Sequence, residues 1–464
     1  MDFLKEAAVP GAFHNSLERS DPPKCHKHTR EAILDKIMDW VKRKIDTDTF
    51  IMWLYGAAGA GKSAIAQSIA ELCEEHKLLL ASFFFFRADS LRSNSKRLVA
   101  TIAYQIAVVI PDVRGLMEAA IDNDPHLLSR SLITQFTALI VDPLEHLFEN
   151  SVGEHMDLPS LIIIDGLDEC MDGTQVQILD MVFAIGKRSK FPFNFLVASR
   201  PELEISAAMG DGKIREGLAR LRLDADFTSR HDIRRFLLDK FDEIRLTHPI
   251  RSDLPLSWPS SEDIETLVYK SSGQFIYAST IVKFISSPRH GPDHRLEIIL
   301  DLRPKGKDLP FAELDALYRY VLSSVEETTT TVQIIATALT LRYGVRIGAL
   351  TEVLDLSPRD IKLHLIDLGS LVEFRDNFLE ILHASLGDFL FDESRSQELY
   401  IDQRLIHTKI TQVILRQYLK PDGSKQFICC QLRCHTKTHY QTSIGRFHLI
   451  SCNATFLKQN GLLT

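Results

Sequence analysis

The stretch Gly56-Ala57-Ala58-Gly59-Ala60-Gly61-Lys62-Ser63 decides the fold of this 464-residue chain, because it fits the pattern G-x-x-x-x-G-K-[ST] in full. An apolar run, Phe50–Tyr55, precedes it, and a helical pattern, Ala64–His76, follows it. In that strand–loop–helix context, backbone N–H groups at a helix N-terminus wrap phosphate groups. Lys62 is placed to reach the β- and γ-phosphates and Ser63 to hold magnesium. The stretch therefore predicts a nucleotide-phosphate site formed by Gly56, Ala57, Gly59, Ala60, Gly61, Lys62, Ser63 and Ala64.

A second motif places acidic residues directly after an apolar run. Leu161–Asp165 is continued by Gly166, Leu167, Asp168 and Glu169. Because ligands of α/β folds bind at the carboxyl ends of parallel strands, Asp165 is expected to hold the magnesium ion. Asp168 or Glu169 is a candidate for orienting an attacking water molecule, and the alternative is that these two acids cap the following helix.

An arginine follows the next apolar run along the chain. Phe193–Ser199 ends at Arg200. At this edge of the sheet an arginine can sense the γ-phosphate and stabilise charge in the transition state. The alternative is an ordinary surface ion pair.

Apolar runs alternate with helical patterns over the first half of the chain. A helix is expected over Thr29–Lys44, with Thr29 as its N-cap, and others over Arg97–Ile110 and Ser131–Phe148. Such alternation is typical of a parallel α/β sheet whose strands are buried on both faces. The four consecutive phenylalanines that end the second run are therefore expected in the core and not in a binding patch. The predicted strands are Phe50–Tyr55, Leu78–Phe86, Leu161–Asp165, Phe193–Ser199 and Leu221–Leu223.

After Asp224 the pattern is helical and ends in a short hairpin, which indicates a helical domain followed by a winged-helix-like module. Helices are expected over Ser229–Arg245, Ser261–Ser271, Phe275–Ile285, Leu314–Val325, Val332–Leu341, Ile347–Leu354 and Pro358–Leu368, and hairpin strands over Leu371–Phe374 and Phe378–Leu382. The Pro- and Gly-rich stretch Gly291–Pro310 is expected to be a junction. The predicted domains are a lead-in (1–28), a nucleotide-binding domain (29–225), a helical domain (226–310), a winged-helix-like domain (311–400) and a C-terminal helix with a divergent tail (401–464).

Composition excludes several classes of protein. A net charge of −8 and a pI of about 6.1 disfavour a broad nucleic-acid-binding surface. A local basic patch is the alternative for four residues, and solvated charges are their simpler interpretation: Arg342, Arg346, Arg359 and Lys362. No apolar run reaches the ~18 residues that a spanning helix needs, so no membrane segment is expected.

The seven cysteines form no dense disulfide framework, which favours a reducing, cytoplasmic setting. The tail holds a group of Cys and His residues, but no C-x₂-C pair faces a matching pair, so zinc binding is not expected there. The group consists of Cys429, Cys430, Cys434, His435 and His439.

The pairing of GAAGAGKS with LIIIDGLDEC and FLVASRPE resembles the NACHT NTPases, members of the STAND class of signal-transduction P-loop ATPases with numerous domains. The chain is most similar to fungal NACHT proteins of the nephrocystin-3-like type, through SLITQFTALIVDPL, SGQFIYASTIVKFI and HASLGDFLFDESRS. This resemblance implies a sheet of strand order 5-1-4-3-2, covered by helical and winged-helix domains.

The resemblance also implies further site residues and a function. Thr29 and Arg30 match a pair that contacts the base or ribose, and His383 resembles a winged-helix histidine that touches the ADP β-phosphate; from the residues alone His383 is a structural histidine. The cofactors implied are ATP or ADP and Mg²⁺. The function implied is a switch that hydrolyses ATP slowly, self-associates in its ATP state and signals to an unidentified protein partner. A nucleic-acid-dependent ATPase and a small-molecule kinase are the alternatives.

Overall fold

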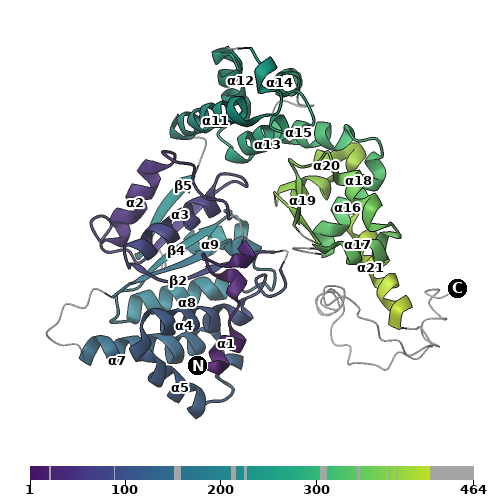
Figure 1. Ribbon diagram of the computed structural model, residues 1–464. Helices are drawn as coiled ribbons and strands as arrows, with labels where there is room; N and C mark the ends of the chain where they lie inside the picture. Colours follow the sequence, from purple (N-terminus) through teal and green to yellow (C-terminus); the bar gives the residue numbers. More distant parts are fainter. Residues whose placement is uncertain are drawn as a thin grey trace. The chain divides into compact units, whose positions relative to one another are not determined.

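Five parallel strands form the first sheet, in the order β2-β3-β4-β1-β5 (Figure 1). This is the predicted order, 5-1-4-3-2, read from the opposite edge. The strands are β1 (Ile51–Gly56), β2 (Leu79–Phe84), β3 (Leu161–Asp165), β4 (Asn194–Ser199) and β5 (Leu218–Leu223). The computed structural model describes residues 1–418 apart from 20–21, 88, 151–157, 211–215, 224–226, 256, 304–310, 342–344, 376 and 384.

Successive residues of the central strands enter two separate cores, one on each face of the sheet. Ile51 and Trp53 belong to one core, and Met52 and Leu54 belong to the other. Side chains alternate along a strand, so a continuous apolar run is what a strand covered on both faces requires. The phenylalanine run follows the same rule, since Phe83 and Phe85 enter one core, Phe84 enters the other, and all three are buried. The prediction that this run is core is confirmed for them.

Helices cover both faces of the sheet (Figure 1). On one face lie α2 (Glu31–Val41) and α3 (Lys62–Glu75). The other face is covered by α1 (Asp2–Ala7), α4 (Leu98–Val109), α5 (Arg114–Asn123), α6 (Leu132–Phe136), α7 (Asp142–Asn150), α8 (Gln175–Arg188) and α9 (Leu203–Gly210). The lead-in contributes to this core through Leu4 and Val9.

Three local expectations were wrong. Thr29 does not cap α2; the N-cap is Arg30, in a left-handed conformation, while the Thr29 hydroxyl donates to the backbone of His26. The helix expected over Ser131–Phe148 is interrupted by a π-helical segment between α6 and α7. The stretch expected to be a junction contains α14 (Pro292–Asp301).

The helices after the sheet begin and end close to their predicted positions. They are α11 (Phe227–Thr247), α12 (Ser261–Ser271), α13 (Phe275–Ile285) and α15 (Ala312–Ser323). In α12, Ser260 forms a capping box with Asp263, which fixes where that helix begins.

The described chain divides into two compact units. The first consists of residues 1–324, 368–371 and 382–389, and the second of the residues between and after those segments. The second unit contains a three-stranded antiparallel sheet in the order β6-β8-β7, of which the pair β7–β8 was predicted and β6 was not. Its elements are α16 (Thr328–Leu341), β6 (Val345–Arg346), α17 (Ile347–Leu354), α18 (Pro358–Leu365), β7 (Val372–Arg375), β8 (Phe378–Ile381), α20 (Glu393–Ser396) and α21 (Gln403–Tyr418), while α19 (Ser385–Leu390) lies almost wholly in the first unit.

Candidate functional site

The phosphate loop joins β1 to α3, as predicted. Gly59 (φ 74°) and Gly61 (φ 93°) adopt left-handed backbone conformations, which glycine enters without a Cβ penalty. Gly61 is the N-cap of α3. The Lys62 ammonium donates to the carbonyl oxygens of Gly56 and Ala57, each at 2.9 Å. The loop is thus curled around its own cation, at a helix N-terminus suited to an anion.

Ser63 and Asp165, the two predicted magnesium ligands, are in direct contact. The Ser63 side chain is hydrogen-bonded to the Asp165 carboxylate. Burial raises the pKa of Asp165 to about 6, and neighbouring Asp168 adds to the rise, while the Ser63 hydrogen bond and the charge of Arg19 oppose it. Its Oδ1 atom is buried and has no hydrogen-bond partner within the described part of the chain.

The residues at this position fit Mg²⁺. A buried carboxylate oxygen without a partner normally requires an explanation, and a hard divalent cation that prefers oxygen ligands supplies one. The hydroxyl and the carboxylate are close enough to share one ion. The two side chains therefore suit the chemistry of the predicted ion, and their binding of Mg²⁺ stays a prediction.

The Asp168 carboxylate holds Arg200 at two points. It accepts from the Arg200 backbone N–H at 2.9 Å and pairs with the guanidinium Nε at 3.2 Å, and the Asp168 side chain is only 3% exposed. The alternative in which Asp168 and Glu169 cap the next helix has no support, because the N-cap of α8 is Thr174. The arrangement places Arg200 in a partly buried ion pair at the sheet edge, unlike an ordinary surface pair.

Glu169 lies beside Asp168 in the turn Leu167–Glu169. Its Oε2 atom accepts from the backbone N–H of Arg87 at 2.9 Å. Burial raises the pKa of Glu169 to about 7, opposed by Arg87 and reinforced by Asp168 and Asp165. A carboxyl group with a pKa near neutrality is suited to taking up a proton.

Charges of both signs meet at the Lys62 ammonium. Burial lowers the pKa of Lys62, the charge of Arg200 lowers it further, and the three carboxylates Asp165, Asp168 and Glu169 raise it. The acidic motif and Arg200 both lie more than 100 residues after Lys62 in sequence and still act electrostatically on it, because parallel strands bring their carboxyl ends to one edge.

Two residues that the sequence analysis missed complete this charge cluster. Arg87 follows β2 and Asp388 lies in α19. Asp388 bridges two arginines: Oδ1 lies 3.2 Å from Nη1 of Arg87, and Oδ2 lies 2.8 Å from Nη1 of Arg200. For Arg87 there was a signal, since it follows a buried strand as Arg200 does. Asp388, which is 188 residues from Arg200, lies in the stretch HASLGDFLFDESRS that carries the resemblance, but only His383 was singled out there.

Arg30 connects the phosphate loop to α11. Its guanidinium donates to the carbonyl oxygen of Ala60 at 3.1 Å and to the Ser229 hydroxyl at 2.9 Å, and its backbone N–H donates to Asp232 at 3.1 Å. Thr29 is buried beside it. The contact of Thr29 and Arg30 with a base or ribose stays a prediction.

His383 is half-buried in the first unit, between a helix and a loop. Its Nε2 atom lies 3.2 Å from the Thr280 hydroxyl of α13, and it is hydrogen-bonded to the Ser370 backbone. Burial lowers the pKa of His383 to about 3, and Lys283 lowers it further, so the imidazole is neutral at physiological pH. The contact of His383 with a β-phosphate also stays a prediction.

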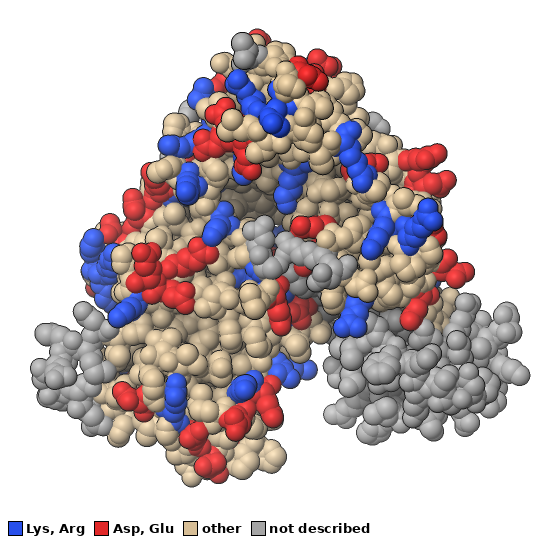
Figure 2. All heavy atoms as spheres, in the orientation of Figure 1, with Lys and Arg blue, Asp and Glu red and all other residues tan. Residues whose placement is uncertain are grey.

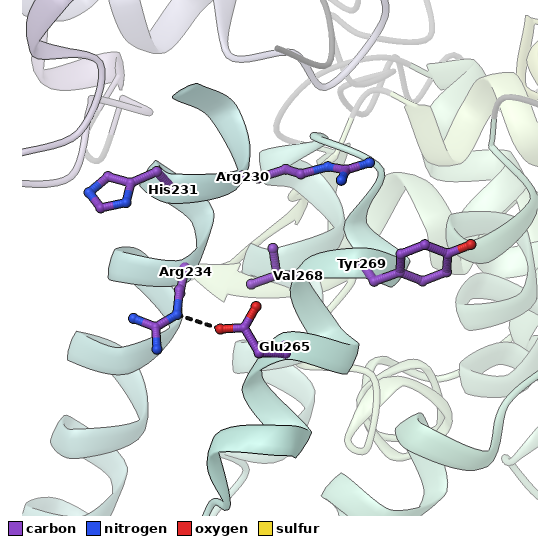
Figure 3. A pocket seen from close by; sticks show the side chains of 6 residues that line it. All are labelled: Arg230, His231, Arg234, Glu265, Val268 and Tyr269. Atoms are coloured by element: carbon purple, nitrogen blue, oxygen red, sulfur yellow. Dashed lines mark hydrogen bonds and ion pairs between the residues drawn. The ribbon is translucent and has the colours of Figure 1, made fainter. Parts of the chain in front are cut away.

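A pocket of about 360 Å³ lies elsewhere, between α11 and α12 (Figure 3). Arg230, His231 and Arg234 line it on one helix and Glu265, Val268 and Tyr269 on the other, and Arg234 faces Glu265 in an ion pair of 2.5 Å. None of the residues that line this pocket comes from the phosphate loop or the acidic motif.

The surface gives no sign of a basic face for nucleic acid in the part of the molecule seen in Figure 2, where Lys and Arg are interspersed with Asp and Glu. Arg346 packs over the Phe378 ring at 5.5 Å, and Arg342 lies outside the described residues. The Cys and His group of the tail lies outside them too. Among the residues that the structure describes, no cluster of metal-ligating side chains of three or more is found, and none of the helices has the length and apolar character needed to cross a bilayer.

Comparisons with known proteins agree with the motifs. A family described as "Nephrocystin 3, N-terminal" matches residues 28–200, a segment that includes the phosphate loop, the acidic motif and Arg200. No curated protein matches the chain.

Solved structures resemble the chain at low identity. A STAND protein with a tetratricopeptide repeat sensor from Pyrococcus horikoshii is 13% identical, with 90% of this chain and 52% of that protein covered and a TM-score of 0.45. The chain thus spans about half the length of that protein. A Walker-type ATPase of Pyrococcus abyssi is 16% identical, with 79% and 97% covered and a TM-score of 0.35. The Orc1 protein of Aeropyrum pernix, solved in complex with DNA, is 12% identical, with 79% and 92% covered and a TM-score of 0.34. By its loop and its strand order, the first part of the chain has the P-loop NTPase fold, and residues 28–200 are similar in sequence to the N-terminal region of nephrocystin 3.

Proposed function

We propose that the chain is a nucleotide-dependent switch of the NACHT and STAND type, which binds ATP or ADP with Mg²⁺, hydrolyses ATP slowly and self-associates in its ATP-bound form. One observation carries the proposal: Asp388, far along the chain, contacts Arg200 at the edge where the terminal phosphate would lie. A segment that touches the phosphate-sensing arginine can respond to which nucleotide is bound.

The chemistry assigned to each residue follows from its position. Lys62 and the loop amides bind the phosphates, and Ser63 and Asp165 hold Mg²⁺, which would neutralise charge on the phosphate oxygens. Glu169 accepts a proton from the attacking water, and Arg200 stabilises charge on the terminal phosphate. Slow turnover is consistent with Arg200 being engaged by two carboxylates, Asp168 and Asp388, which must share it with the phosphate.

The test compares molar mass in two nucleotide states. Size-exclusion chromatography with light scattering is run with Mg²⁺ and either ADP or a non-hydrolysable ATP analogue, on the wild type and on Lys62→Ala. A larger mass with the analogue, absent in the variant, is expected. Identical mass and shape in both states, together with measured binding of both nucleotides, would count against a switch.

The same samples separate the two alternatives. ATP hydrolysis stimulated by DNA and suppressed by salt would favour a nucleic-acid-dependent ATPase. Phosphorylation of a small molecule faster than bare hydrolysis would favour a kinase. Neither is expected.

A further inference from the structure

Arg87 and Arg200 leave the carboxyl ends of two strands, β2 and β4, that lie on either side of β3. β3 itself carries Asp165 and leads into Asp168 and Glu169. The two guanidinium groups therefore flank the acidic motif, and both reach the same carboxylate, Asp388.

Asp388 is bound as an anionic ligand would be, by two separate arginines, and not by one arginine in a bidentate pair. Each of its oxygens meets a different arginine, and its side chain is 23% exposed. Guanidinium groups bind carboxylate and phosphate with similar geometry, so one can replace the other. A phosphate carries more negative charge than one carboxylate, so it can compete with Asp388 for the same guanidinium donors.

The Arg200 side chain and the backbone of Arg87 would keep their positions if Asp388 left. Arg200 stays anchored through its backbone N–H and Nε to Asp168, which is almost fully buried. Arg87 stays anchored through its backbone N–H to Glu169. The Nε atom of Arg87 is buried and lacks a hydrogen-bond partner in the described part of the chain, so this side chain has donor capacity that its present contacts do not use.

We propose that Arg87 and Arg200 form a two-arginine receptor for the terminal phosphate of a nucleoside triphosphate, and that the Asp388 carboxylate occupies this receptor when no such phosphate is there. Arg87 is thus a second phosphate-sensing residue, and Asp388 is an internal competitor. A diphosphate has no group to displace Asp388, so the competition acts on the triphosphate alone. This inference rests on the proposed nucleotide binding.

The test measures two dissociation constants for each variant, for N-methylanthraniloyl derivatives of ADP and of a non-hydrolysable ATP analogue, with Mg²⁺. Asp388→Asn is expected to tighten binding of the triphosphate analogue about tenfold, and Arg87→Gln to weaken it about tenfold, because a charge-assisted hydrogen bond contributes on that order. Both variants are expected to keep diphosphate binding within about twofold. When Asp388→Asn is combined with Arg87→Gln, the tightening of triphosphate binding that Asp388→Asn causes is expected to be smaller than in the wild-type background.

Glu202→Gln is the matched control, because Glu202 is an exposed carboxylate near both arginines that forms no ion pair with either among the described contacts. It is expected to leave both constants within about twofold, which separates a specific contact from a general change of charge. If Arg87→Gln fails to fold, Arg87→Lys is measured, with the same selective loss expected.

The outcomes distinguish the two proposals. If the wild type binds neither nucleotide, or binds as Lys62→Ala does, the proposed function fails. If the wild type binds both while Asp388→Asn and Arg87→Gln change the two constants equally or not at all, nucleotide binding stands and the two-arginine receptor is refuted.

Discussion

Ser63 donates a hydrogen bond to Asp165, although the two residues are about 100 positions apart in sequence. One follows the phosphate loop and the other ends β3. Their contact brings a hydroxyl and a carboxylate close enough for both to reach one Mg²⁺ ion, and Oδ1 of Asp165 is buried without a hydrogen-bond partner among the described residues.

Lys62→Ala is expected to abolish tight nucleotide retention. The phosphate loop would lose the cation that can exchange the carbonyls of Gly56 and Ala57 for phosphate oxygens. The measurement is the amount of nucleotide that co-purifies, with calorimetric titration of ADP and Mg²⁺. Lys36→Ala, on the exposed face of α2, is the control and should bind as the wild type does. Unchanged affinity in Lys62→Ala would show that the site is assigned to the wrong loop.

Glu169→Gln is expected to slow ATP hydrolysis about 100-fold, the usual contribution of a positioned base, while ATP binding stays within about threefold. The amide can still accept the hydrogen bond from the Arg87 backbone, so the turn should keep its shape. Single-turnover hydrolysis and an equilibrium titration separate the two effects. A variant that hydrolyses ATP at the wild-type rate would remove Glu169 from the mechanism.

The hydrolysis rate of the wild type is expected to rise with pH. The pKa of Glu169 is raised to about 7, so its carboxylate fraction increases from about one tenth at pH 6 to about nine tenths at pH 8. A base acts in its deprotonated form, and hence the rate increases through this range and then levels off. Glu169→Gln should lack this rise. A flat wild-type profile between pH 6 and 8 contradicts the assignment.

Asp165→Asn is expected to stabilise the protein at pH 8 in the absence of Mg²⁺. The folded-state pKa of Asp165, about 6, lies above its usual value near 4, so protonated Asp165 stabilises the fold below about pH 4, and that contribution is lost as the pH rises through about 6. The gain at pH 8 is on the order of 1–3 kcal/mol and vanishes near pH 4. Urea unfolding at both pH values checks it.

Asp180 is an exposed carboxylate of α8, and Asp180→Asn is the control for that comparison. It should leave the urea midpoint unchanged at both pH values. Mg²⁺ with ADP should stabilise the wild type and have little effect on Asp165→Asn, because the variant lacks the ligand. If the wild type is more stable than Asp165→Asn at pH 8 without Mg²⁺, the burial of a charged Asp165 does not cost stability as argued.

Arg30→Ala is expected to destabilise the protein even without nucleotide, by about 2–4 kcal/mol. The buried guanidinium joins Ala60 of the phosphate loop to Ser229 of α11, and its loss leaves their polar groups without that partner. Thermal unfolding with and without ADP is the measurement, and Arg230→Ala, exposed on α11, is the control. If Arg30→Ala weakens ADP binding with no loss of stability, the contact with the base or ribose would be the better account.

The sequence by itself determined the strands of the parallel sheet, the phosphate loop and most of the helices after the sheet, but it gave no helix at α8 (Gln175–Arg188) between β3 and β4. Continuous apolar runs cannot be half-exposed strands, so Ile51–Gly56 and Leu161–Asp165 had to be buried on both faces, and a glycine-rich loop between strand and helix has a narrow range of shapes. The sequence-based prediction was wrong at Thr29, where a residue typical of an N-cap hydrogen-bonds to the preceding turn. It also missed β6, because a strand of two residues is too short to form a pattern.

Only the tertiary structure decided how the charges are paired. A motif records which residues are near one another along the chain, whereas an ion pair depends on distance in space. The stretch around Asp388 carries a resemblance but does not say what Asp388 contacts, and Asp388 matters because the chain returns it to within hydrogen-bonding distance of Arg87 and Arg200. The raised pKa values of Asp165 and Glu169 have the same origin, since desolvation depends on everything packed around a group and not on the residues beside it in the chain.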